Sequence, residues 1–146
     1  MLKVSQKRLK QLARQHGLDL VVLFGSQASG RAHTGSDVDV AVRIKPGRTL
    51  SADARLALAG DFDSVFPDAA LVDVSFLNEA GSLLLYEVAT RGRPLYERAP
   101  LSFWQFQSYA ARRYDDDYKY RLRREAYLER RVKEWDHKRK PSSSKN

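Results

Sequence analysis

Asp37 and Asp39 stand one residue apart at the start of an apolar segment, and their type and spacing point to metal chemistry. Residues i and i+2 of a strand point to the same side, so the two carboxylates lie next to each other. Their mutual repulsion and lost hydration are costly unless a cation lies between them. Carboxylate oxygens suit Mg²⁺, which leaves coordination positions for phosphate oxygens. The pair therefore indicates a magnesium site.

A third carboxylate, Asp73, lies within the alternating segment 70–77, on the side away from its valines. If the strands that carry Asp73 and the Asp37–Asp39 pair are neighbours, three carboxylates meet on one surface. Metal ions held there activate an attacking hydroxyl and neutralise departing phosphates.

Gly25 and Ser26 end an apolar segment about ten residues before the aspartate pair. A turn of small residues with free backbone N–H groups at the start of a helix binds anions, and the Ser26 hydroxyl adds a donor. The stretch 23–42 thus combines a phosphate-binding turn with two metal ligands.

Alternating helices and strands must position these residues, which is typical of a small α/β domain. Helices are expected at 5–16, 50–65 and 82–90, and strands at 19–24, 37–44 and 70–77, with a short strand in 91–97. Ser5 is the expected N-cap of the first helix and Gly17 its end. In the second helix, Leu56, Leu58, Phe62 and Val65 have near-helical spacing.

From Leu101 the sequence predicts one helix almost to Lys140, up to about 60 Å long, which is more than the width of the domain. We therefore divide the chain into a domain at 1–99, a helical extension at 100–140 and a disordered tail at 141–146. An apolar stripe runs along the extension and needs a fold-back or a partner to cover it. Its members are Tyr114, Tyr118, Leu122, Leu128, Val132 and Trp135.

Most of the net positive charge lies in this extension. Residues 110–146 contain 13 Lys and Arg against 7 Asp and Glu, whereas residues 1–109 contain 13 against 11. This balance suits an acidic partner or nucleic acid, and equally a solvated basic helix. Within Tyr114–Arg121 we expect surface ion pairs from Asp115 to Lys119 and from Asp117 to Arg121, not a second metal site.

Composition excludes several classes of protein. Without cysteine there is no disulfide framework or Cys-ligated zinc, and three scattered histidines argue against zinc altogether. No apolar run reaches the roughly 18 residues of a membrane span, and residues 1–10 lack a signal-peptide core. We expect a cytoplasmic protein without a membrane segment.

Together these features resemble the minimal nucleotidyltransferase (MNT) domain of the polymerase-β-like superfamily. The family motif is roughly Gly-Ser-x-Ala-Arg-Gly, five residues, then Ser-Asp-x-Asp. This chain reads GSQASG at 25–30, RAHTG at 31–35 and SDVD at 36–39. The resemblance covers about residues 4–97 and implies a mixed sheet flanked by helices.

By this resemblance, Gly25, Ser26, Arg31 and Ser36 bind the nucleoside triphosphate, ATP. Asp37, Asp39 and Asp73 are the implied catalytic residues and Mg²⁺ ligands. The chain departs from the motif at Ser29, where the family has Arg. Arg31 and Arg43 are the two candidates to supply the missing positive charge.

Single-domain MNT proteins of this size resemble the antitoxins of HEPN/MNT toxin–antitoxin pairs. The resemblance implies transfer of AMP from ATP to a tyrosine hydroxyl of a HEPN ribonuclease toxin, in a hetero-oligomer with that toxin. One alternative is a binding antitoxin or nucleic-acid-binding module that has lost the chemistry, although nucleic acid is not favoured. Another is a small-molecule nucleotidyltransferase, which normally needs a larger acceptor domain.

Overall fold

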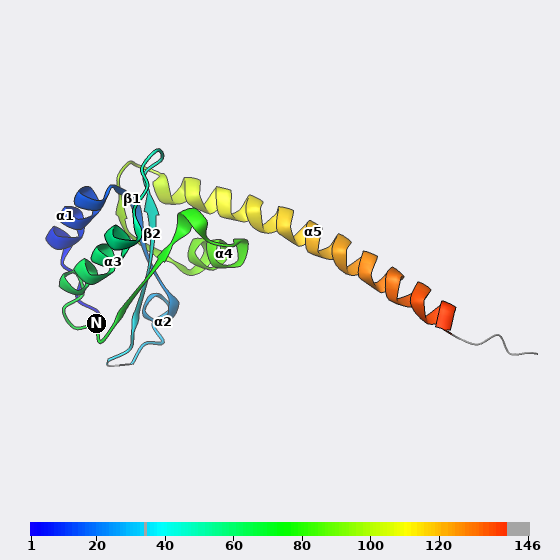
Figure 1. Ribbon diagram of the computed structural model, residues 1–146. Coiled ribbons are helices and arrows are strands. Elements are labelled where there is room, and N and C mark those ends of the chain that lie inside the picture. The colour runs from blue at the N-terminus through cyan, green and yellow to red at the C-terminus, as the bar shows by residue number, and fades with distance from the viewer. Residues whose placement is uncertain (34, 140–146) are drawn as a thin grey trace, which may run out of the picture.

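Strand β1 (Leu18–Phe24) lies inside a four-stranded sheet whose order is β3-β2-β1-β4. The computed structural model describes residues 1–33 and 35–139. Strands β2 (Val38–Ile44) and β4 (Arg93–Glu97) both run antiparallel to β1, whereas β3 (Val72–Phe76) pairs in parallel with β2. Every residue of β1 is buried, because helices cover both faces of the sheet. The predicted mixed sheet flanked by helices is confirmed (Figure 1).

The helices form one layer on each face. On one face, α1 (Gln6–His16), α3 (Ala52–Asp61) and the short 3-10 turn η1 (Phe62–Ser64) enclose the larger core cluster. On the other face, α4 (Ser82–Arg91) and the first turns of α5 (Ser102–Arg139) enclose a second cluster. A four-residue helix, α2 (Gly25–Ala28), follows β1, and a second 3-10 turn, η2 (Leu77–Glu79), follows β3.

The alternation predicted for β2 is confirmed by its packing. Val38, Val40, Val42 and Ile44 belong to the larger core cluster, whereas Ala41 belongs to the cluster under α4 and α5. Asp39 and Arg43 share the side of Ala41 because side chains alternate along a strand. The carboxylate side of β2 is therefore the side that α4 and α5 cover.

The predicted ends of α1 are also confirmed. The Ser5 hydroxyl accepts a hydrogen bond from the backbone N–H of Arg8, and Gly17 ends the helix with φ 67°. The second predicted helix was only partly right, because Leu56 is 75% exposed while Leu58 is fully buried. Residues two positions apart on a helix point about 200° apart, so Leu56 and Leu58 cannot share the core face.

The long helix α5 begins inside the domain and ends far outside it (Figure 1). Ser102, Phe106 and Ala110 are buried. The first turns of the helical extension predicted at 100–140 therefore pack in the core of the domain. The helix contains 38 residues, about 57 Å of continuous helix, and does not fold back. The expected disordered tail at 141–146 lies outside the described residues.

The ion pairs expected on α5 were wrong. Over the described residues, the salt bridges of this helix include Arg131–Glu134 but neither Asp115–Lys119 nor Asp117–Arg121. The Arg121 guanidinium instead lies 5.7 Å from the ring centre of Tyr114. Exposed ion pairs contribute little free energy, so an aromatic contact readily replaces one.

No helix in the described ranges, α5 included, is both long and apolar enough to cross a membrane.

Candidate active site

The pairing of β2 with β3 brings two of the predicted carboxylates together. Asp39 is directly opposite Asp73 in the parallel register, and Asp37 comes two residues before Asp39. Asp39 is partly buried, whereas Asp37 and Asp73 are exposed. The three acidic residues therefore lie at one end of the sheet, on the side of α4.

The pKa of Asp39 is raised above its ordinary value of 3.8. Burial is the largest cause, followed by repulsion from Asp73, Asp37 and Glu87. A raised carboxyl pKa is expected where several carboxylates lie close together without a cation between them.

Glu87 was missed by sequence reasoning. It lies on α4, and its charge acts on Asp39 because α4 crosses the sheet on the carboxylate side. The sequence places Glu87 away from the apolar positions of its helix but gives no sign of which strand the helix crosses. This contact depends on the path of the chain and not on any local motif.

Gly25 lies against the carboxylate of Asp39. Its φ is 70°, a conformation that side chains rarely adopt, and a Cβ at this position would overlap the Asp39 carboxyl group. The backbone turns here from β1 into α2, and the first N–H groups of any helix have no partner within it. The phosphate-binding turn expected from the sequence thus begins directly beside a predicted metal ligand.

The loop after α2 is closed by its own hydrogen bonds. The Arg31 N–H donates to the carbonyl of Ser26 at 3.1 Å, and the His33 N–H donates to the Ser36 hydroxyl at 2.8 Å. Ser26 and Arg31 are exposed at this end of the sheet, and Ser36 is partly buried. Ser36 therefore holds the loop together, and its role as a nucleotide ligand stays a prediction.

Arg43 is not placed to replace the missing motif arginine. Its Nε donates to Asp19 Oδ1 at 2.8 Å, and both side chains are largely buried. Arg43 is four residues beyond Asp39 on the same strand, roughly 13 Å away at 3.3 Å per residue. Of the two candidates, only Arg31 lies in the loop beside α2.

The donor chemistry of the site fits Mg²⁺, since Asp37, Asp39 and Asp73 offer only oxygen atoms. In the described part of the chain, no three His, Asp or Glu side chains are drawn together closely enough to hold an ion. The assignment of these residues as metal ligands stays a prediction.

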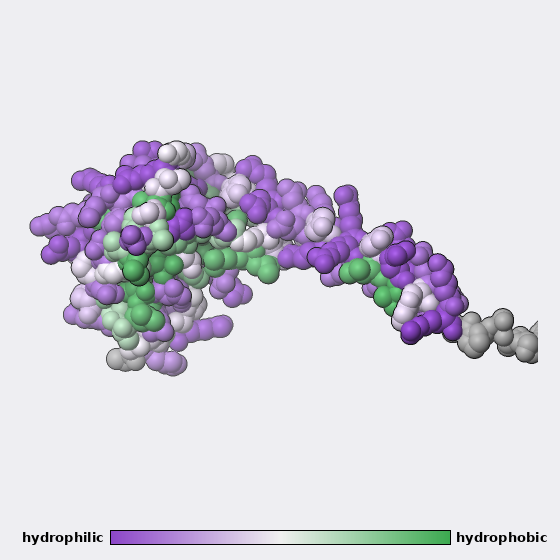
Figure 2. Space-filling model, viewed as in Figure 1, coloured by the Kyte–Doolittle hydropathy of each residue, from purple (hydrophilic) through white to green (hydrophobic). Residues whose placement is uncertain are grey.

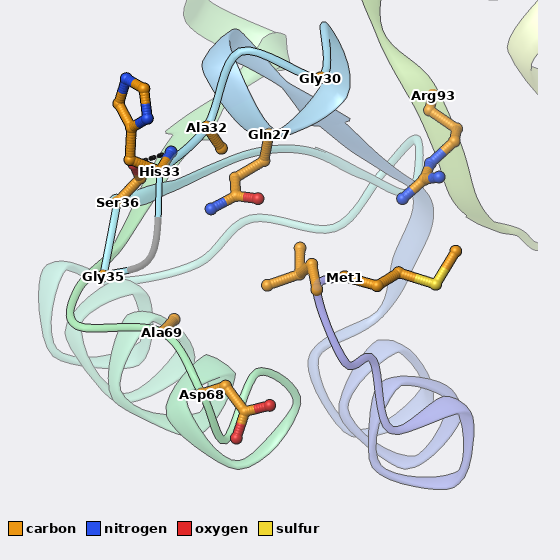
Figure 3. A pocket seen from close by; sticks show the side chains of 11 residues that line it. Met1, Gln27, Gly30, Ala32, His33, Gly35, Ser36, Asp68, Ala69 and Arg93 are labelled. Atoms are coloured by element: carbon orange, nitrogen blue, oxygen red, sulfur yellow. Dashed lines mark hydrogen bonds between the residues drawn. The ribbon is translucent and has the colours of Figure 1, made fainter.

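The loop after α2 also lines a cavity of about 650 Å³ (Figure 3). Gln27, Ser36 and Arg93 line it, together with Asp68 and the chain start at Met1. The neighbouring Leu2 and Ala69 pack on the core under α1 and α3, so this cavity is separate from the carboxylates. We place the candidate active site at the carboxylates, because they are the predicted metal ligands.

Comparison with known families settles the class of this site. A family described as "Polymerase beta, Nucleotidyltransferase" matches residues 7–101, which include the glycine–serine turn and all three aspartates. The chain belongs to this nucleotidyltransferase family. The resemblance inferred from the motif is thereby confirmed.

Individual proteins and solved structures are also similar to this chain. The chain is 34% identical to protein adenylyltransferase MntA of Shewanella oneidensis over 99 residues, which are 66% of this chain and 68% of MntA. Its fold is similar to a chain in the crystal structure of a toxin–antitoxin with AMP-PNP, with a TM-score of 0.66 and 27% identity. That match covers 88% of this chain and 99% of the other.

A second similar structure shows a tri-AMPylated Shewanella oneidensis HEPN toxin in complex with MNT antitoxin. The TM-score is 0.60 at 26% identity, over 87% of this chain and 95% of the other. The two structural matches cover 87–88% of this chain, which is more than the span 7–101 matched by the family. Both matches therefore extend into α5.

Proposed function

We propose that this chain is the antitoxin of a HEPN/MNT pair, which transfers AMP from ATP to a tyrosine hydroxyl of a HEPN ribonuclease toxin and so neutralises it. The observation that carries this proposal is the position of Asp39, which has Asp73 opposite it on β3 and Gly25 against its carboxylate. A phosphate-binding turn and a set of acidic ligands are thus in direct contact. The relatives named as a protein adenylyltransferase and as an MNT antitoxin support the choice of acceptor.

The transfer itself is a displacement at the α-phosphorus of ATP. The tyrosine oxygen forms a bond to phosphorus, the bond from phosphorus to the bridging oxygen breaks, and pyrophosphate leaves. Asp73 would receive the proton of the tyrosine hydroxyl, since it is the more exposed carboxylate of its pair with Asp39. The first N–H groups of α2 and the Ser26 hydroxyl hold the phosphates.

Asp37, Asp39 and Asp73 would hold Mg²⁺ at this site. When bound, magnesium neutralises phosphate charge and favours ionisation of the attacking hydroxyl. The pKa of Asp39 is raised by burial and then by repulsion from Asp73, Asp37 and Glu87, and bound cations would relieve the part that is due to repulsion.

The experiment is transfer of labelled AMP from ATP to a purified HEPN-type toxin. Asp39→Asn keeps the shape of the side chain and removes its charge, so we expect transfer to fall by at least about 100-fold. Asp63→Asn is the matched control, because Asp63 is an exposed carboxylate in η1 on the opposite face of the sheet. Near-normal transfer by the Asp39→Asn variant would show that the chemistry lies elsewhere.

A second candidate is a binding antitoxin that keeps the fold without the chemistry. Ser29 favours it, because the usual motif arginine is absent. In that case the unaltered chain would capture the toxin and leave its mass unchanged after incubation with ATP and magnesium. Mass spectrometry of the toxin separates the two candidates directly, since each AMP unit adds a fixed mass.

A further inference from the structure

The outer half of α5 carries large apolar side chains that no other part of the described chain covers. Leu128 is 50% exposed, Val132 58% and Trp135 55%, and all three come after Tyr114, which stacks on Tyr86 of α4. Figure 2 shows a hydrophobic patch along the outer part of this helix, separated by hydrophilic surface from the patch next to the domain. We call Leu128, Val132 and Trp135 the distal stripe.

The distal stripe continues the face by which α5 packs on its own domain. At 100° per residue, Val132 points in the same direction as Tyr114, and Leu128 in the direction of the buried Ala110. Tyr114 stacks on Tyr86 of α4 at 4.2 Å between ring centres, so this face is turned to the side of α4. A partner on the distal stripe would therefore lie on the same side of α5 as α4 and the carboxylates.

The spacing of the stripe fits one mode of recognition. Leu128, Val132 and Trp135 stand at positions i, i+4 and i+7, the pattern by which a helix inserts into an apolar groove of another protein. Trp135 also carries the Arg139 guanidinium 3.9 Å from its ring centre, which keeps a cation at the edge of the stripe. The expected occupant is a protein with a groove between helices.

The charges beside the stripe differ from one flank to the other. Arg124 and Arg131 follow one flank, and Glu129 and Asp136 follow the other, by their helical positions. Arg131 makes an exposed ion pair with Glu134 at 3.7 Å, which is weak enough to be exchanged for a partner's carboxylate. A groove with an acidic rim along one side would complement the arginine flank.

A second copy of this chain does not fit the stripe. In an antiparallel pair of α5 helices, the arginine flank of one copy would face the arginine flank of the other, which is repulsive. In a parallel pair, the domain packed on Phe106 and Ala110 would occupy the place of the partner's helix. The formal net charge of +8 adds to the repulsion between copies.

We propose that the distal stripe is the docking site for the toxin, inserted into an apolar groove whose rim is acidic beside Arg124 and Arg131. This inference rests on the proposed function and names the surface by which the substrate protein is held. Docking at the stripe keeps the acceptor tyrosine near Asp73, so that transfer takes place within a complex. Nucleic acid is a poorer occupant, since Glu129 and Asp136 would face its phosphates.

The test measures the binding of a purified HEPN-type toxin to two double variants of the full-length chain. Leu128→Glu with Val132→Glu places charge on the stripe. Ala126→Glu with His137→Glu is the matched control, since both residues are exposed on the same helix and point about 120° and 140° away from Val132, on the side opposite Arg124 and Arg131. We expect the stripe variant to bind the toxin at least about 30-fold more weakly and the control to bind normally.

A second measurement reports on the stripe directly. With 5-fluorotryptophan in this chain alone, fluorine NMR sees only its two tryptophans, Trp104 and Trp135. The Trp104→Phe and Trp135→Phe variants assign the two signals. We expect the Trp135 signal to shift when toxin is added, while the Trp104 signal at the base of the helix stays nearly unchanged.

Each outcome decides one of the two proposals. Unchanged toxin binding by the stripe variant, or an unmoved Trp135 signal in the complex, overturns the docking site. Loss of dimerisation or of salt-sensitive RNA binding in the stripe variant, with toxin capture intact, would also overturn it. Capture of toxin through the stripe without transfer of AMP overturns the proposed function alone. Binding of the ATP analogue should be equal in all variants.

Discussion

Asp39 and Asp73 are directly opposite each other on the parallel strands β2 and β3. Two carboxylates at paired positions of neighbouring strands repel each other, and cross-strand pairs of like charge destabilise a sheet. The raised pKa of Asp39 reflects this cost together with burial. A pair of neighbouring carboxylates is unfavourable in the free protein, but the same pair can ligate a cation.

The first prediction concerns stability without metal. Because the pKa of Asp39 is raised from 3.8 in the folded state, folding favours the protonated carboxyl group. The folded state therefore loses stability as pH rises from 3.8 through the raised pKa of Asp39 in the folded state. Asp39→Asn should raise Tm in EDTA at about pH 7 and should not raise it at about pH 3. Thermal unfolding at both pH values checks this, and an equal effect at both would contradict it.

The second prediction separates nucleotide binding from chemistry. Asp73→Asn should lower the rate of AMP transfer by about 100-fold or more, because it removes the proposed acceptor of the hydroxyl proton. Binding of an ATP analogue should change little, since Asp73 is at the exposed edge of the site. Calorimetric titration measures the affinity for the ATP analogue, and a transfer assay measures the rate of AMP transfer. Ser75→Ala, two residues further along β3, is the control, and an equal loss there would point to damage to the strand.

The third prediction compares two glycines that have the same left-handed backbone conformation. Gly25 and Gly30 have φ of 70° and 71°, but only at Gly25 would a Cβ overlap another group, the Asp39 carboxylate. Gly30→Ala should cost roughly 1–2 kcal/mol of unfolding free energy and leave ATP binding unchanged. Gly25→Ala should cost more and should abolish ATP binding. Equal losses in both variants would remove Gly25 from the site.

The fourth prediction tests which arginine replaces the motif arginine. Arg31→Gln should weaken ATP binding about 10-fold with little change in Tm, because Arg31 is exposed beside α2. Arg43→Gln should leave ATP binding unchanged and lower the unfolding free energy by roughly 1–3 kcal/mol, because Asp19 loses its partner. Titration and chemical denaturation of both variants decide between them. The reverse pattern would assign the charge to Arg43.

Local patterns predicted much of this fold. Strict alternation placed Asp39 on the side of β2 opposite its valines, and the capping residues Ser5 and Gly17 marked the ends of α1. Each depends on a few adjacent residues, and backbone geometry links them directly to structure. The motif from Gly25 to Asp39 predicted the family for the same reason.

Contacts between distant segments were less predictable. Nothing in the sequence placed Glu87 near Asp39 or joined Arg43 to Asp19 across the β1–β2 pair. Leu56 was misplaced because its helix has apolar residues on more than one side. These relationships depend on the crossing of helices over the sheet, which periodicity does not encode.

The helix α5 joins two regions with different local stability. Amide protons up to about Tyr114 are held by helix and core together, so their exchange with solvent should require unfolding of the domain. Beyond that residue the helix has only its own hydrogen bonds, and unsupported helices of this length open readily in water. Exchange should therefore be fast from Tyr118 onward in the free chain. Where a partner covers the outer turns, exchange slows there first, and the free energy of association includes the ordering of that half of the helix.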